Sequence, residues 1–304
     1  QSIIPWLDFF HVALVVHVDL SVLIWFLAMA GVFWTLSNPK SGGRIDQMAW
    51  FLAALGALIM VSSPFFGVGN PLMNNYVPVL QHGAYYLALG IFGAGIALLL
   101  LGRLVHLPKR PKEGKSVLAF ACYLAAIPAL LSILALLWSY ALIPERYDGE
   151  YFFELLFWGG GHTLQFTHTL LLLVAWLWLA NACGARFSQA PEFITSLCLL
   201  VILPIILVPW IYTSVAVDSI GRRLHFTKLM QYGGLACMPL GLLAVIQLFR
   251  MDKAKADQKP LKSAFTASFI LFTAGGVIGF LIEGVNVVIP AHYHGSIVGV
   301  TLSF

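Results

Sequence analysis

Two histidines, His292 and His294, stand two residues apart at the start of the last apolar stretch, directly after Pro290-Ala291. On an α-helix, residues i and i+2 point about 200° apart. The two imidazoles therefore cannot share one metal ion, but each can hold a different one. Neutral imidazole is the commonest metal ligand, and a histidine inside a membrane span is costly and usually functional. The pattern indicates two ligands on opposite sides of one helix; two hydrated interfacial histidines are the alternative.

The composition of the chain excludes a soluble globular protein. Of 304 residues, 60% are hydrophobic and 10% charged, and the mean hydropathy is +0.88. Nine apolar runs recur, each far too long for a barrel strand. They lie at 10–36, 48–66, 77–102, 117–143, 152–182, 193–217, 228–249, 264–283 and 290–304. The sequence predicts an all-α polytopic transmembrane helix bundle, with residues 1–304 as a single integral membrane domain.

The basic residues predict how the runs are oriented. Thirteen of the 17 Lys and Arg residues fall in four alternate loops: Lys40, Arg44, Arg103, Lys109, Arg110, Lys112, Lys115, Arg186, Arg250, Lys253, Lys255, Lys259 and Lys262. Cytoplasmic loops carry such an excess, so we expect the N-terminus of the chain on the outer side, in a bacterial inner (cytoplasmic) membrane. The net charge of +4 is then a topology signal, and no nucleic-acid partner is expected.

Both ends of the chain are expected to be truncated. Gln1 is not an initiator residue. The last run stops at Phe304 after about fifteen residues, short of the roughly twenty that a spanning helix needs.

The predicted topology gathers histidines at one level of the membrane. Six of the nine fall in the outer part: His17, His82, His162, His225, His292 and His294. Chance placement would scatter them through both halves, so we predict a layer of buried metal centres near the outer face. The other three are expected to bond to carbonyls or to be solvated: His11, His106 and His168.

Three motifs resemble one known family. Glu154-Leu-Leu-Phe-Trp158-Gly-Gly-Gly-His162 resembles the sixth-helix motif of the haem–copper oxygen and nitric oxide reductases. Ala291-His292-Tyr293-His294 is similar to their tenth-helix Ala-His-Phe-His, and His17-Val-Asp19-Leu with Trp25 is similar to their second helix. The resemblance, to cytochrome c oxidase subunit I and the nitric oxide reductase large subunit, implies that the nine runs are helices two to ten of a twelve-helix fold.

The resemblance also implies roles for individual histidines. His17 and His294 would hold a low-spin haem from both sides, and that haem would only pass electrons. His292 would be the single ligand of a high-spin haem with an open face for a gas. His162, with His225, would bind the non-haem metal opposite that face, either copper or iron. The chain would then be the catalytic subunit of a respiratory terminal reductase.

One departure from the family concerns the non-haem metal. The family offers two adjacent histidines before its eighth helix, whereas residues 222–227 contain only His225. Another ligand is then needed, and the nearby options are Gln165, Glu154 and Asp218. Glu154 lies eight residues before His162, about two turns outward on nearly the same helix face.

A second departure concerns the substrate. Oxygen reductases typically carry a tyrosine four residues after the histidine that corresponds to His162, where this chain has Phe166. In another branch the tyrosine lies on the next helix, shortly before the paired histidines; Tyr212 is there, but thirteen residues before His225. Splitting O2 needs four electrons at once, while coupling two NO molecules needs two and no tyrosine donor. The sequence therefore favours reduction of NO to N2O. Reduction of O2 to water, as in cytochrome c oxidase, is close behind because oxygen reductases dominate the family.

The carboxylates near the outer boundary are weaker candidates for proton supply. Leu164 stands where the family has a carboxylate, and Asp19 and Glu283 are expected to be hydrated at the interface, so proton pumping is not predicted. Gly159-Gly160-Gly161 indicates either a close approach of a backbone or haem or loose helix packing.

The implied partners are other subunits of a respiratory complex, cytochrome c or quinol as electron donor, and membrane lipid. Two other functions stay open. The first is a di-haem membrane electron carrier without a gas site, because ligation around 222–227 is incomplete. The second is a transporter with histidines as proton relays.

Overall fold

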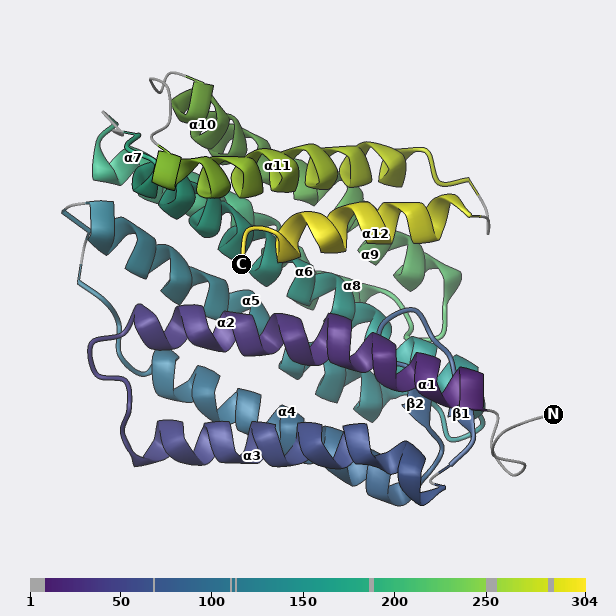
Figure 1. Ribbon diagram of the computed structural model, residues 1–304. Helices are drawn as coiled ribbons and strands as arrows, with labels where there is room; N and C mark the ends of the chain where they lie inside the picture. The colour runs from purple at the N-terminus through teal and green to yellow at the C-terminus, as the bar shows by residue number, and fades with distance from the viewer. Residues whose placement is uncertain are drawn as a thin grey trace. The chain divides into compact units, whose positions relative to one another are not determined.

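The computed structural model describes residues 9–67, 69–109, 111–112, 114–185, 189–249, 256–283 and 287–304. Helices make up most of these residues (Figure 1), with one short hairpin. Within the described residues, eight helices are long and apolar enough to cross a membrane. The prediction of an all-α polytopic helix bundle and of an integral membrane protein is confirmed at this level.

The first span is one long helix interrupted by a π-helical turn. It consists of α1 (Phe9–Val18), the π segment η1 (Asp19–Ile24) and α2 (Trp25–Leu36). Asp19 opens the π segment and is only 1% exposed, and the hydroxyl of Tyr85 on α4 donates a hydrogen bond to its carboxyl group. The expectation of a hydrated interfacial Asp19 was wrong, because a tertiary partner from another helix takes the place of water.

The next two spans form a closely packed pair, α3 (Arg44–Ser62) and α4 (Gly83–Leu104). A 3₁₀ turn, η2 (Ser63–Phe66), and an antiparallel hairpin of β1 (Pro71–Leu72) and β2 (Val79–Leu80) join them. The predicted run 77–102 therefore began six residues too early. Residues 77–80 are apolar because they are buried in and beside the hairpin, and the side chain of His82 accepts the Ala84 N–H to cap α4.

Two longer helices follow, α5 (Gly114–Leu142) and α6 (Gly149–Ala182). Pro128 lies inside α5, where proline disrupts the backbone hydrogen bonds of the preceding turn. The hydroxyl of Thr167 donates to the carbonyl oxygen of Ala125 at 3.0 Å. A side chain of α6 thus satisfies a carbonyl that water cannot reach in a membrane.

The sixth and seventh spans are each a helix pair joined by a 3₁₀ turn. The sixth is α7 (Pro191–Ile202), η3 (Leu203–Ile206) and α8 (Leu207–Ser214); the seventh is α9 (Ile220–Gly233), η4 (Gly234–Cys237) and α10 (Met238–Phe249). The seventh begins eight residues before the predicted run 228–249, so His225 lies on α9 and not in a loop. Hydropathy does not reveal the start of α9 because its polar residues include Arg222, whose guanidinium donates to the carbonyls of Val215 and Tyr212.

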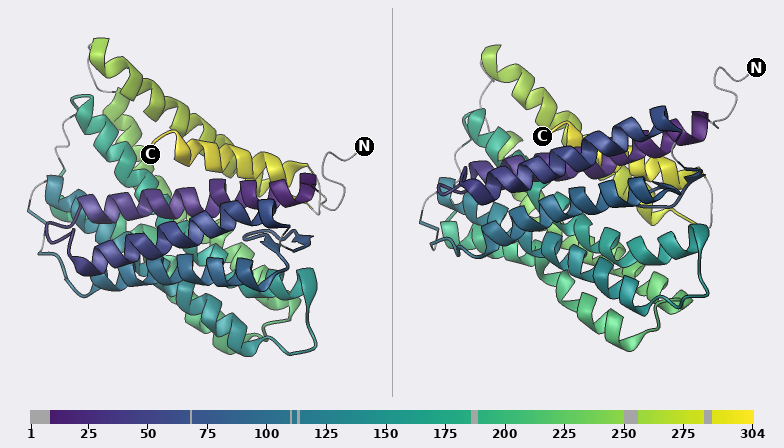
Figure 2. Two further views of the ribbon diagram at one scale, coloured as in Figure 1. Left: turned by 60° about the horizontal axis from the view of Figure 1, so that its bottom comes forward. Right: turned by 90° about the horizontal axis from the view of Figure 1, so that it is seen from below.

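The last two helices, α11 (Lys259–Phe280) and α12 (Val288–Thr301), lie side by side in both views of Figure 2; α11 follows the 3₁₀ turn η5 (Ala256–Gln258). Both helices present glycines four residues apart at their contact, a motif that lets helix backbones approach closely. Ser268 on α11 donates to the Gly299 carbonyl of α12 at 2.5 Å and accepts the indole N–H of Trp176 on α6 at 2.8 Å.

The chain divides into two compact units, each built from separate stretches. The first comprises Gln1–Leu107, Ala126–Leu164 and Val208–Phe226, and the second Pro108–Ala125, Gln165–Leu207 and Thr227–Phe304. Five residues of the basic-loop pattern lie outside the described residues: Arg110, Arg186, Arg250, Lys253 and Lys255.

Candidate functional site

His162 is the most enclosed of the candidate ligands in the first unit. Its side chain lies on α6 and is 6% exposed. Nδ1 is 2.8 Å from the Trp158 carbonyl oxygen and 2.7 Å from the Tyr76 hydroxyl. A carbonyl oxygen can only accept, so Nδ1 carries the ring proton, and the hydroxyl oxygen shares it. The lone pair of the imidazole is then on Nε2.

Three aromatic rings surround His162 and are called here the aromatic box. The ring centroids of Trp158, Tyr76 and Phe226 lie 4.7, 5.3 and 5.9 Å from that of His162. Each ring comes from a different part of the chain: α6, the β1–β2 connection and α9. The indole N–H of Trp158 donates to the Arg223 carbonyl at 3.3 Å, which ties two sides of the box together.

The three glycines before His162 make room for these neighbours. A Cβ on Gly161 would overlap the ring of Tyr76, and a Cβ on Gly159 would overlap the hydroxyl of Tyr212. A Cβ on Gly160 would lie 3.0 Å from the carbonyl oxygen of Ser132, whose own hydroxyl donates to the Gly160 carbonyl at 2.7 Å. Close approach, not loose packing, accounts for all three glycines, and what approaches is protein.

The loop that carries Tyr76 is held by side-chain hydrogen bonds. The Asn74 side-chain oxygen accepts the backbone N–H groups of Tyr76 and Val77, at 3.0 and 2.9 Å. Asn75 donates its backbone and side-chain N–H groups to the two carboxylate oxygens of Glu154, at 3.2 and 2.5 Å. Glu154, an option for the missing metal ligand, is thus committed to this loop.

His225, the second histidine expected at the metal, points away from His162. His225 directs Nδ1 to the Gly221 carbonyl at 2.6 Å and packs against Trp210, with ring centroids 5.6 Å apart. Its neighbour Phe226 is the α9 residue that contacts His162, because consecutive helix residues diverge by about 100°. Gln165 lies three residues after His162 on α6. Among the described residues, no group of three His, Cys, Asp or Glu side chains is placed to hold a metal ion.

Tyr212 and Asp218, also named from the sequence, have structural partners. The Tyr212 hydroxyl donates to the Ala135 carbonyl at 2.8 Å and lies 2.7 Å from the Ser139 hydroxyl. Asp218 accepts from Tyr147 at 3.0 Å and from Arg146 at 2.8 Å. The hydrogen bond from Tyr147, with a smaller contribution from Arg146, holds the pKa of Asp218 below its ordinary value.

His17 occupies an exposed position on α1, just before the π segment. Its backbone carbonyl accepts the hydroxyl of Ser21 at 2.7 Å. Asp19, two residues later, is buried against Tyr85. The helix therefore presents His17 on the face away from the buried Asp19, as positions i and i+2 require.

His292 and His294 lie on α12 in the second unit and differ in their surroundings. His292 is partly buried, and its Nδ1 is 2.7 Å from the Gly275 carbonyl of α11. A Cβ on Gly279 would lie 2.8 Å from this ring, so glycine makes room for it. His294 is exposed, with Nδ1 2.7 Å from the Pro290 carbonyl of its own helix. The two imidazoles face different sides of the helix.

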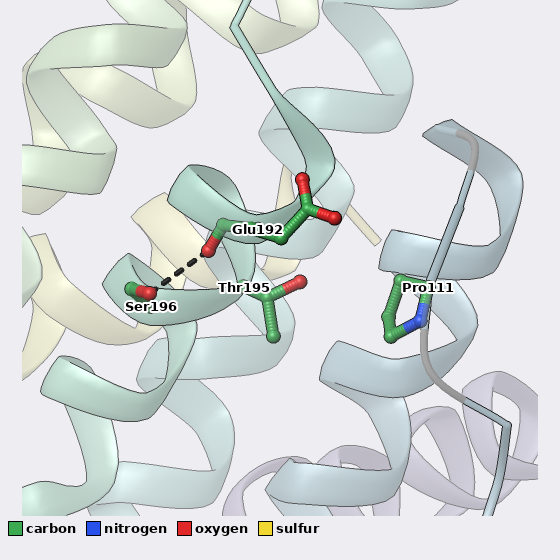
Figure 3. Close-up of a pocket in the computed structure, with 4 residues that line it drawn as sticks. All are labelled: Pro111, Glu192, Thr195 and Ser196. Carbon is green, nitrogen blue, oxygen red and sulfur yellow. Dashed lines mark hydrogen bonds between the residues drawn. The ribbon is translucent and has the colours of Figure 1, made fainter.

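A shallow pocket of about 180 Å³ lies in the second unit, lined by Pro111, Glu192, Thr195 and Ser196 (Figure 3). The Ser196 hydroxyl donates to the Glu192 carbonyl at 2.8 Å and the Thr195 hydroxyl to the Pro191 carbonyl at 2.7 Å. Both hydroxyls are therefore satisfied within their own helix.

Comparison with known proteins finds similar chains over nearly the whole length. An uncharacterised protein of Rickettsia prowazekii is 29% identical, covering 97% of this chain and 68% of its own length. An uncharacterised protein of Aquifex aeolicus is also 29% identical, covering 94% of this chain and 70% of its own. No family model matches the chain, and no solved structure matches it.

Proposed function

We propose that this chain is the catalytic subunit of a haem-binding membrane reductase of the haem–copper type. The hydrogen bonding of four histidines supports the proposal. In each of them Nδ1 lies within hydrogen-bond distance of a backbone carbonyl oxygen: His162, His225, His292 and His294. Each therefore keeps the lone pair on Nε2. Metal-ligating histidines are typically oriented in this way, with the other ring nitrogen bonded to a carbonyl or carboxylate.

The donor chemistry fits haem. Neutral imidazole is a common axial ligand of haem iron, and the resemblance assigns His17 and His294 to one haem and His292 to another. Haem, if bound, would supply one-electron chemistry and a place for a diatomic gas. The pairing of His17 with His294 joins residues of different units and rests on the resemblance alone.

The described residues fit a non-haem metal less well. His162 offers one nitrogen, but its neighbours are the rings of the aromatic box, and His225 packs on Trp210. No group of three suitable side chains occurs in the part of the chain that is described. We therefore derive no step through a copper or non-haem iron at this site.

The choice between NO and O2 also changes. The sequence favours NO because it predicts no tyrosine beside His162. Tyr76, from a loop 86 residues earlier in the chain, has its hydroxyl 2.7 Å from this imidazole. The ground for ranking NO above O2 is therefore removed, and we propose a diatomic gas as the substrate class.

The second candidate is a di-haem electron carrier without a gas site. The incomplete set of ligands around His162 favours it. Both candidates use the same haem-binding histidines, so the presence of haem alone does not separate them.

An optical spectrum of the purified, reduced protein, with and without carbon monoxide, tests both candidates. A band shifted by carbon monoxide beside an unshifted low-spin band is expected for the reductase, and the His292→Ala variant should lose only the shifted part. Haem that ignores carbon monoxide would leave the electron carrier, and a protein without haem would exclude both. Turnover of NO and of O2 then identifies the substrate.

A further inference from the structure

The connection between β1 and β2 crosses over the imidazole of His162. Residues 73–77 have no regular secondary structure, yet side chains fix them at three points. Asn74 organises the turn, Asn75 is bonded to Glu154, and Tyr76 reaches Nδ1 of His162. This segment is called the strap.

The anchor and the contact of the strap lie on one helix. Glu154 and His162 are eight residues apart on α6, about two turns. The strap therefore bridges two points of a rigid element, with two hydrogen bonds to the Glu154 carboxylate and one to His162. Two bonds against one make Glu154 the stronger attachment.

The surrounding sequence is adapted to the strap. Gly161 has no Cβ, and the space that a Cβ would fill is taken by the ring of Tyr76. The same ring packs edge-on against Trp158, with centroids 5.9 Å apart. Tyr76 thus restrains the His162 ring from the side of Nδ1, while the Trp158 carbonyl sets its proton on that nitrogen.

We propose that Tyr76 is the positioning residue of His162 and that Glu154 is the anchor that holds it there. The strap keeps the imidazole in one orientation, with Nδ1 bonded to the Trp158 carbonyl and the Tyr76 hydroxyl. This inference goes beyond the proposed function and needs no metal at His162. It also explains why the Glu154 carboxylate bonds to Asn75 of the strap.

Site-specific labelling of histidines with diethyl pyrocarbonate, read by peptide mass spectrometry on the full chain in lipid nanodiscs, tests the strap. The reagent acylates an unprotonated imidazole nitrogen, and His162 should label slowly in the wild type because it is enclosed. Glu154→Ala should raise its rate about tenfold, since both hydrogen bonds that anchor the strap are lost. Tyr76→Phe, which keeps the ring, should raise it about fivefold, and Glu154→Gln should restore much of the protection.

Tyr212→Phe is the matched control, because Tyr212 packs on Gly159 of the same glycine run but bonds to Ala135. It should leave the His162 rate unchanged, and His225 should label equally in every variant. Equal rates for His162 in the wild type, Tyr76→Phe and Glu154→Ala would overturn the proposal. A rise with Tyr212→Phe as large as with Tyr76→Phe would overturn it too, because general loosening would then explain both.

Haem content, measured on the same samples, separates the two levels of inference. If the protein contains no haem but Glu154→Ala raises the labelling rate of His162, the strap is supported and the reductase is excluded. If the protein contains haem but the labelling rate does not change, the reductase is supported and the strap is excluded.

Discussion

The α3–α4 pair of the first unit and the α11–α12 pair of the second both bring helix backbones together through small residues. A Cβ on Gly95 of α4 would lie 2.5 Å from the backbone nitrogen of Ala53, and one on Gly275 of α11 would lie 2.5 Å from that of Ser296. The α3–α4 contact is apolar along its glycines and includes a buried ion pair between Asp46 and Arg103. The α11–α12 contact instead has His292 packed on Gly279.

The two pairs use close packing at glycines for different purposes. In α3–α4 the small residues hold the two helices together, because the backbone of one helix contacts the backbone of the other. In α11–α12 one glycine makes room for an imidazole, whose Nδ1 is then held by the Gly275 carbonyl. Stability should therefore respond to changes in the first pair, and histidine chemistry to changes at Gly279 in the second.

The largest effect is expected at the ion pair of α3–α4. The side chains of Arg103 and Asp46 are 5% and 11% exposed, and their charged groups lie 2.8 Å apart. Asp46→Ala would leave a buried, unpaired guanidinium and should cost about 3–5 kcal/mol of unfolding free energy. Equilibrium unfolding in mixed micelles measures this. The double variant Asp46→Leu/Arg103→Met should recover most of the loss, and no recovery would mean that the charge is not the cause.

A smaller effect is expected at Gly95. A Cβ there meets the backbone of α3, which cannot swing aside, so Gly95→Ala should destabilise by about 1–3 kcal/mol in the same unfolding assay. Gly90→Ala on α4 is the control, because nothing lies within 4 Å of its Cβ position. It should be neutral or slightly stabilising. Equal effects at Gly90 and Gly95 would contradict close packing of α3 on α4.

At Gly279 the expected change is in the hydrogen bonding of His292 and only slightly in stability. An added Cβ meets the His292 ring at 2.8 Å, and a side chain can turn away. Gly279→Ala should cost less than about 1 kcal/mol but break the bond from Nδ1 to Gly275, which ¹⁵N NMR of labelled histidine reports. Gly276→Ala, with open space around it, should leave the His292 signal unchanged. A large stability loss for Gly279→Ala would make the two helix pairs alike.

The smallest effect concerns Asp218, outside both pairs. Its pKa in the folded protein lies below the ordinary value of 3.8 because of Tyr147 and Arg146. Its stabilising contribution is therefore full above that value and is lost as the pH falls through the folded pKa. Hydrogen exchange of residues 144–148 should differ a few-fold between wild type and Asp218→Asn at neutral pH and converge once the pH has fallen below the folded pKa. A difference that persists at low pH would exclude this carboxylate as the cause.

The helical runs could be predicted because spanning a bilayer demands long apolar stretches. The predictions failed where tertiary contacts replace water. Residues 77–80 are apolar but belong to a hairpin and its connection. Arg222 is charged but lies in a helix, where it donates to the carbonyls of Tyr212 and Val215. Composition cannot separate these cases, because it does not record which groups are satisfied.

His162 was found by its motif, but its principal neighbour was not. Tyr76 lies in a loop 86 residues earlier. The two positions at which the sequence analysis expects a tyrosine, 166 and 212, both lie on helices. Two asparagines, Asn74 and Asn75, favour a turn, yet nothing local indicates that the turn crosses His162. That contact depends on Glu154 and Gly161, whose roles emerge only with the strap in place.

The sequence by itself determined a polytopic helical membrane protein and the opposed directions of His292 and His294, because helix length and helix period are local properties. Only the tertiary structure decided the partners of polar groups in the membrane. Asp19 bonds to Tyr85 and His162 to Tyr76. A buried polar group must be paired wherever the fold supplies a partner, and the chain order does not say where that is.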